Sequence, residues 1–308
     1  MRARPRNCRV VVPATGANLG PGFDAVAMAL QLYLSLDVQW TDGPCQEVQV
    51  VGSAGAEATD DGVAMARAAA AAGLRLAGRE GLGYRLRVHS DIPTARGLGS
   101  SAALRVACLL AATADSEEVP RSVLAAEAAR LEGHPDNSTA ALEGGTVVVA
   151  ASAEELSWVK LRTPEHLVAV VAVPGVTVAT DQSRAALPEA VPFEDAVFDV
   201  ARAALLVAGL ERERFDVLAE AMDDRLHQPY RLDSIPGARE AIRRARESGA
   251  KGAALSGSGP AVLALCDRRE RKMEAVARAM EAAFEEAGVP AECLVLSPDN
   301  DGARVTPA

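Results

Sequence analysis

The spacing of hydrophobic and polar positions divides the chain into strands and helices of ordinary length. Short apolar runs and alternating positions predict strands. Apolar positions three to four residues apart, often followed by glycine, predict helices. The predicted strands are residues 8–12, 30–40, 48–51, 84–89, 144–151, 167–173, 252–255, 261–266 and 291–296. The predicted helices are residues 65–76, 100–114, 121–131, 196–209, 214–222, 238–248 and 268–287.

The order of these elements predicts an α+β fold with two domains. A chain of 308 residues is long enough for two domains of ordinary size. The hydrophobic pattern loosens around residues 152–165, so the domains are predicted as residues 1–158 and 159–308. In the second half, helices alternate with strands in an order that is typical of a split-βαβ sandwich.

Composition and charge narrow the classes of partner. The hydrophobic fraction is 49% and the charged fraction 24%, which is ordinary for a globular protein. The formal net charge of −10 disfavours nucleic acid and anionic membrane surfaces as partners. The five cysteines include no C-x-x-C pair, which disfavours a disulfide framework or a cysteine zinc site and favours a reducing compartment. Since no apolar run reaches membrane-spanning length and no secretory signal is visible, the sequence predicts a cytoplasmic protein.

A glycine-rich segment, residues 93–103 with the sequence PTARGLGSSAA, carries the strongest chemical signal. Gly97 and Gly99 allow a close approach of the backbone to a ligand. The helix predicted from Ser100 offers free N–H groups and the positive end of its dipole to an anion. The hydroxyls of Ser100 and Ser101 can cap that helix, bind phosphate oxygens or ligate Mg²⁺. A capped helix after a flexible turn would show the same composition.

Two common phosphate-binding motifs are excluded for this segment. A Walker A loop would need a lysine after the second glycine, and none is present. A dinucleotide fingerprint would need a third glycine three residues after Gly99, which is also missing. A phosphate loop of another type remains.

Three segments together resemble the signature motifs of the GHMP kinases, which include galactokinases, homoserine kinases and mevalonate kinases. They are the loop 93–103, the run PATGANLGPGFD at 13–24 and the run ALSGSGP at 254–260. The N-terminal run, and the further segments EGHPDN and DRLHQPYR at 132–137 and 224–231, are similar to the homoserine kinase branch. The resemblance implies a ribosomal-S5-like N-terminal domain, a ferredoxin-like C-terminal domain and an active site in the cleft between them.

The resemblance implies ATP and Mg²⁺ as the molecules bound at the loop. The implied ATP contacts are Val63, near the adenine, and Pro93, Arg96, Gly97, Leu98, Gly99, Ser100, Ser101 and Ala102. The implied metal ligands are Ser100, Ser101 and Glu127, which lies ten residues before Asn137. Other acidic residues nearby fit the family's spacing less well; these are Glu117, Glu118 and Glu132.

The implied acceptor is L-homoserine, a zwitterion with a reactive hydroxyl. Its carboxylate is expected to bind Arg184 and Arg231, because a guanidinium holds a carboxylate with two parallel hydrogen bonds. Its ammonium is expected at Asp24 and Asn18. The hydroxyl is expected at Asn137, with the neighbouring contacts His134, Asp136 and Gly257. The residue expected to have a structural role is His227.

No dedicated catalytic base is predicted. The implied catalytic residues are Asn137, Asp24 and Arg184. An amide such as that of Asn137 cannot accept a proton at neutral pH. A loose phosphoryl-transfer transition state needs positioning and charge stabilisation more than a base. The fallback candidate for a base is Asp24.

Departures from the homoserine kinase pattern leave other functions open. Gly16, Leu34 and Ser138 each differ from the residue usual at that position. A GHMP kinase for another small amino or hydroxy acid is therefore an alternative. A kinase-like nucleotide-binding regulator without activity is the second alternative. A homodimer is expected only because two-fold oligomers are common among soluble enzymes.

Overall fold

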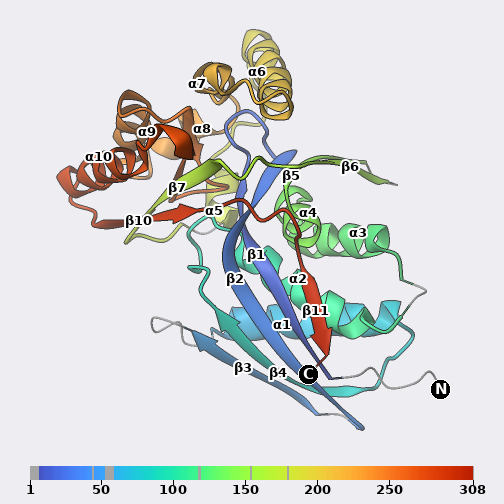
Figure 1. Cartoon of the computed structure of the whole chain (residues 1–308). Coiled ribbons are helices and arrows are strands. Elements are labelled where there is room, and N and C mark those ends of the chain that lie inside the picture. The colour runs from blue at the N-terminus through green and yellow to red at the C-terminus, as the bar shows by residue number, and fades with distance from the viewer. Residues whose placement is uncertain are drawn as a thin grey trace.

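The computed structural model describes residues 7–43, 45–52, 59–116, 119–152, 155–178 and 180–307, except the side chains of 180–182. It has the α+β architecture that the sequence predicts, built on two separate β-sheets with helices packed against each (Figure 1). No helix in the described ranges combines the length and the apolar character that crossing a membrane requires.

The first sheet has seven strands, with β2 at its centre. Its path is β11-β1-β2-β4-β3, and β5 pairs with both β2 and β6. Because β2 is 16 residues long, it pairs with β4 through residues 34–41 and with β5 through residues 26–28. The strands are β1 (Cys8–Ala17), β2 (Val26–Thr41), β3 (Gln46–Gly52), β4 (Gly83–Ser90), β5 (Thr146–Ala151), β6 (Leu156–Leu161) and β11 (Arg304–Pro307).

Small side chains allow the helices of this half to pack closely. The helices are α1 (Asp60–Leu76), α2 (Ser100–Thr113), α3 (Arg121–Glu132) and α4 (Asp136–Glu143). Almost every residue of α2 after its first turn is buried. Where α1 crosses α2, a Cβ added to Gly73 would lie 2.7 Å from the Cβ of Ala112. Alanine and glycine thus let the two helices approach each other closely beneath the sheet, near the C-terminal end of α2.

The second sheet is antiparallel, with the order β10-β7-β9-β8. Its strands are β7 (Leu167–Pro174), β8 (Gly252–Leu255), β9 (Val262–Asp267) and β10 (Ala291–Leu296). Helices α9 (Ala238–Glu247) and α10 (Met273–Glu286) cover one face, and Phe284 is fully buried between them and the sheet. The remaining helices are α5 (Thr180–Ala185), α6 (Phe193–Glu211), α7 (Leu218–Ala221) and α8 (Gln228–Leu232).

Most predicted elements are confirmed, and the differences have local causes. The helix predicted at 214–222 is a 3-10 turn followed by the four-residue α7. The helix predicted from residue 268 begins with a 3-10 turn, and α10 starts only at Met273 because Arg271 has a φ of 55°. Helix α4 was not predicted, since its residues Asp136–Thr139 are polar and yet buried.

The chain passes from the first sheet to the second and returns. Strand β6 still pairs with β5, and β7 begins the second sheet at Leu167. After β10 the chain comes back, so that β11 pairs with β1 at the edge of the first sheet (Figure 1). The predicted domain limits, 1–158 and 159–308, stay a prediction. The change of sheet itself falls between Leu161 and Leu167.

Candidate active site

Three turns from distant parts of the chain meet between the two sheets. The Thr15 N–H donates to the Leu98 carbonyl at 3.1 Å, which joins β1 to the glycine loop. The Gly257 N–H donates to the carbonyl of Ala17 at 3.0 Å, which joins the turn between β8 and β9 to the end of β1. That turn also meets the loop directly, because the Ser256 hydroxyl donates to the Gly97 carbonyl at 2.7 Å. The three segments singled out in the sequence therefore form one site.

The glycine loop has the geometry of an anion site. Gly97 and Gly99 have φ values of 77° and 71°, which glycine adopts at little cost. At Gly97 a side chain is also excluded by space, because an added Cβ would collide with the Ser256 carbonyl oxygen. No side chain caps α2 at Gly99, so the first N–H groups of α2 remain available to a ligand anion. Because α2 is buried, water screens its dipole weakly.

The other predicted ATP contacts lie on or near this loop. Leu98 and Ala102 are buried and support its shape, whereas Pro93 and Ser100 are half-buried. The buried Nη1 atom of Arg96 has no hydrogen-bond partner among the residues that the structure describes, as expected for a group that awaits a ligand. Val63 is half-buried in the first turn of α1.

The acidic residue beside the loop is Glu132. The Ser101 hydroxyl donates to Oε1 of Glu132, and Arg105 donates to Oε2. The Glu132 side chain is only 7% exposed. Together the hydroxyl and the carboxylate provide the hard oxygen ligands that Mg²⁺ prefers.

The predicted metal ligand Glu127 lies elsewhere. It receives two hydrogen bonds of 2.8 Å from Arg130 and one of 3.2 Å from Arg75. These arginines, Arg130 first, hold the pKa of Glu127 below its ordinary value. Because Glu127 and Glu132 are five residues apart on α3, their side chains point in directions about 140° apart around the helix axis. The alternatives Glu117 and Glu118 lie outside the described residues.

A polar cluster surrounds Asn137 at the start of α4. The Thr15 hydroxyl donates to Asn137 Oδ1 at 2.6 Å, and Asn137 Nδ2 donates to Asp136 Oδ1 at 3.4 Å. His134 Nδ1 lies 2.7 Å from the same Asp136 oxygen. With its oxygen held by Thr15, the Asn137 amide is fixed beside the glycine loop. Thr15 was not predicted as a site residue, although it lies within the N-terminal motif.

The turn after β1 brings Asn18 and Asp24 to the same place. Both have left-handed backbone conformations, with φ of 68° and 54°, which is costly for residues other than glycine. Asn18 Nδ2 donates to the Gly257 carbonyl at 3.0 Å, and Asn18 Oδ1 accepts from the Asp24 N–H at 3.1 Å. Single ligand atoms of Asp24, His134 and Asp136 lie within 4.8 Å of one another. These three side chains form a polar cluster suited to a cation.

Two arginines face that cluster. Arg184 forms a bidentate ion pair with Asp24, at 2.8 and 2.9 Å. Arg231 is only 3% exposed, and its hydrogen bonds in the described ranges go to two carbonyls and to His227, none of which carries negative charge. Burial, and then the neighbouring Arg184, lower the pKa of Arg231 to about 10, so it remains charged at neutral pH. Both guanidinium groups lie over the Phe23 ring, with the Cζ atoms of Arg184 and Arg231 at 5.4 and 5.1 Å from the ring centroid.

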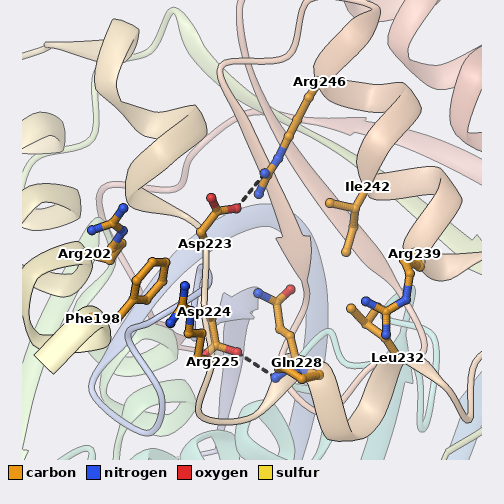
Figure 2. Close-up of a pocket in the computed structure, with 11 residues that line it drawn as sticks. Phe198, Arg202, Asp223, Asp224, Arg225, Gln228, Leu232, Arg239, Ile242 and Arg246 are labelled. Carbon is orange, nitrogen blue, oxygen red and sulfur yellow. Dashed lines mark hydrogen bonds and ion pairs between the residues drawn. The ribbon is translucent and has the colours of Figure 1, made fainter. Parts of the chain in front are cut away.

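A separate cavity of about 420 Å³ lies behind α8 (Figure 2). Gln228, Pro229 and Leu232 line it, together with several arginines. Figure 2 shows Arg246 paired with Asp223 there, and Arg202 and Arg225 are also paired with carboxylates. Because these arginines already have acidic partners, this cavity lacks the excess of positive charge expected of a phosphate site.

Comparison with known proteins identifies the family. The model of the GHMP kinase N-terminal domain matches residues 63–145, and that of the C-terminal domain matches residues 206–286. The chain therefore belongs to the GHMP kinases, enzymes that use ATP as phosphoryl donor.

Within that family the chain is similar to homoserine kinases. It is 42% identical to the homoserine kinase of Moorella thermoacetica, over 96% of this chain and 99% of that one. It is 40% identical to the homoserine kinase of Carboxydothermus hydrogenoformans, over 96% and 95% of the two chains. The crystal structure of homoserine kinase from Cytophaga hutchinsonii superposes with a TM-score of 0.88 at 27% identity, covering 99% of each chain.

The close packing at Gly97 can be tested with a matched pair of variants. Gly97→Ala should lower kcat/KM for ATP by about a hundredfold, because displacement of the loop misplaces the phosphates. Gly81 also has a positive φ, 92°, but no atom lies within 4 Å of an added Cβ. Gly81→Ala should therefore leave kcat/KM within about twofold, at a stability cost of about 1–2 kcal/mol. Equal losses of activity in both variants would show that backbone strain, and not contact with Ser256, limits position 97.

Proposed function

We propose that this protein transfers the γ-phosphate of ATP to the hydroxyl of L-homoserine, giving O-phospho-L-homoserine, a step of threonine biosynthesis. The proposal depends mainly on three charged side chains that complement the ammonium and carboxylate groups of an amino acid: Asp24, Arg184 and Arg231. They lie beside Asn137 and the glycine loop. The names and high coverage of the relatives support it.

The charges of the pocket complement a zwitterion. In the absence of ligand, Asp24 and Arg184 neutralise each other. A zwitterionic amino acid exchanges this one ion pair for two, with its ammonium at Asp24 and its carboxylate at Arg184 and Arg231. Arg231 gains most from this exchange, because it is buried without an anionic partner in the described ranges. A neutral polyol offers no such exchange, which argues against sugar acceptors.

The hydroxyl end of the substrate is proposed to lie at Asn137. Thr15 holds the amide oxygen, so the amide N–H is left to orient the reacting oxygen. The phosphates of ATP are proposed to lie on the backbone from Gly97 to Ala102, at the N-terminus of α2. Direct in-line transfer then needs no dedicated base, since position and charge stabilisation lower most of the barrier.

The magnesium site is proposed at Ser100, Ser101 and Glu132. This assignment moves the acidic ligand from Glu127 to Glu132, because Ser101 contacts Glu132 directly. When bound, Mg²⁺ neutralises charge on the phosphoryl oxygens. In the ligand-free protein, Arg105 occupies the other oxygen of Glu132 and balances its charge.

The proposed cellular location and assembly follow from the composition of the chain and from what is common among enzymes. We keep the cytoplasm as the proposed location and a homodimer as the proposed assembly. The comparisons do not favour the alternative, a GHMP kinase for another amino or hydroxy acid. The departures at Gly16, Leu34 and Ser138 bear on it, because Ser138 follows Asn137 directly and is fully buried.

The acceptor is tested by ADP release with ATP and Mg²⁺. The panel contains L-homoserine, L-threonine, L-serine, mevalonate, galactose and no acceptor. Turnover with L-homoserine should exceed turnover with every other acceptor by about a hundredfold or more, because the others misplace the hydroxyl or lack the charged groups. Faster turnover with another acceptor would replace the substrate assignment. ATP binding without turnover would support a regulatory role.

The metal site is tested by Glu132→Gln, with Glu127→Gln as its matched control. Glu132→Gln should lower kcat by about a hundredfold or more, since it removes a charge beside the transferring phosphate. Glu127→Gln should leave kcat within about twofold, because Glu127 pairs with Arg75 and Arg130, which are mostly exposed and are not part of the glycine loop. Titration with Mg²⁺ should show a raised metal requirement for Glu132→Gln alone. If Glu127→Gln instead lowers kcat and raises the Mg²⁺ requirement while Glu132→Gln does not, then Glu127 is the metal ligand.

The absence of a base is tested by Asp24→Asn. Loss of the ammonium partner should raise KM for homoserine about tenfold or more, and kcat should stay within about tenfold. A general base would lower kcat by about 10²–10⁴-fold. Asp37→Asn, which changes a half-exposed aspartate on β2, serves as the control. If kcat falls by about 10²–10⁴-fold while KM for homoserine is unchanged, then Asp24 is the general base.

A further inference from the structure

His227 lies fully buried at the beginning of α8, where Oδ2 of the buried Asp224 is 3.5 Å from its Nε2 atom. Its Nε2 atom is 2.8 Å from the carbonyl oxygen of Gly20, and its Nδ1 atom is 3.2 Å from Nη1 of Arg231. The ring stacks on Phe23, with centroids 5.2 Å apart and an angle of 26° between the planes. His227 therefore connects the turn after β1 with an arginine of the proposed carboxylate site.

The identity of these partners determines the protonation state of the ring. A guanidinium nitrogen can only donate, so Nδ1 must accept. A carbonyl oxygen can only accept, so Nε2 must carry the hydrogen. Only the neutral ring with its hydrogen on Nε2 satisfies both contacts. The electrostatics agree, because burial and the charge of Arg231 lower the pKa of His227 to about 4.

Among the described residues, the Arg231 guanidinium has three hydrogen-bond partners, and the only side chain among them is that of His227, at 3.2 Å. The two carbonyl contacts, to Ser183 and Gly257, measure 3.3 and 3.4 Å. His227 and Arg231 are four residues apart, a spacing that places two side chains on the same face of a helix. The short helix is itself held by Asp224, whose carboxylate accepts the N–H groups of Leu226 and Gln228.

We propose that His227 is a positioning residue, whose Nδ1 lone pair fixes one nitrogen of Arg231 so that the guanidinium presents its remaining donors to the substrate carboxylate. The Nε2–H bond to Gly20 joins the same ring to the turn that carries Asp24. One imidazole thus sets the separation between the carboxylate end and the ammonium end of the amino-acid pocket. This inference rests on the proposed function, because it requires a substrate that carries a carboxylate.

Two isosteric variants separate the two bonds of the ring. In His227→Asn, the amide oxygen can take the place of Nδ1 and accept from Arg231. In His227→Gln, the amide N–H can take the place of Nε2–H and donate to Gly20, but the acceptor for Arg231 is lost. His227→Gln should raise KM for homoserine about tenfold or more, as expected for loss of a hydrogen bond to a charged group. Its kcat and its KM for ATP should stay within about threefold, since the lost interaction holds the substrate equally in the ground state and in the transition state.

His227→Asn should retain a KM for homoserine within about threefold of the wild type, because the acceptor is kept. Exposed His89 provides a control, and His89→Gln should change none of these values. Equal KM values for the Asn and Gln variants would overturn the proposal. So would a parallel rise in KM for ATP, which would indicate general damage to the fold. Thermal unfolding of each variant shows whether a population of unfolded protein contributes.

A double-mutant cycle tests whether His227 acts through Arg231. Arg231→Ala should raise KM for homoserine, and adding His227→Gln should cause no further increase, because the two residues contribute one interaction. Independent effects of the two changes on KM would show that His227 acts by another route.

The protonation state can be measured without any substrate. Nitrogen-15 NMR of the imidazole groups should show His227 neutral at pH 6, with its hydrogen on Nε2. The chain contains four histidines, so the His227→Asn spectrum assigns the signal. A hydrogen on Nδ1 would overturn the inference even in an active homoserine kinase. If the wild type fails to phosphorylate homoserine and the NMR result holds, the proposed substrate is wrong and the arrangement of the ring stands.

Discussion

The site depends on a small set of backbone hydrogen bonds that join three turns. Thr15 to Leu98 and Gly257 to Ala17 connect the first sheet, the glycine loop and the second sheet. No substitution other than one to proline removes a backbone N–H, so this junction tolerates most variation in side chains but not in the path of the chain. Gly97 shows the constraint most clearly, because both its φ and its contact with Ser256 exclude a side chain.

Much of this arrangement could be predicted from the sequence. Periodicity located the long helices and most strands, because their apolar faces are continuous and their ends carry glycine or proline. The glycine loop was recognised from its own chemistry, and its place at the start of α2 is confirmed. Spacing and family resemblance also brought Asn18, Asp24 and Arg184 together, and the structure places all three around one pocket. These features depend on residues close in the chain or on motifs of unusual composition.

The features of the site that were not predicted depend on the direction in which a side chain points. Spacing along the sequence does not determine that direction. Glu127 was preferred over Glu132 by counting back from Asn137, but α3 ends at Glu132 and a turn intervenes before α4. Helix α4 itself was missed because its buried residues are polar and find their partners across the chain, as Asn137 does with Thr15. His227 was expected to be structural only, since nothing near it in sequence shows that Gly20 and Phe23 pack on it.

The pairing of β11 with β1 has a consequence for how the protein reaches its native state. Cys8 pairs with Pro307, so one edge of the first sheet is completed by residues from the opposite end of the chain. During synthesis on the ribosome, β1 and β2 can form their hairpin early, but the edge of β1 stays open until the whole second sheet has been made. An open edge can pair with strands of other molecules. A protein with this topology is therefore exposed to such pairing for as long as the strands between β2 and β11 are being made.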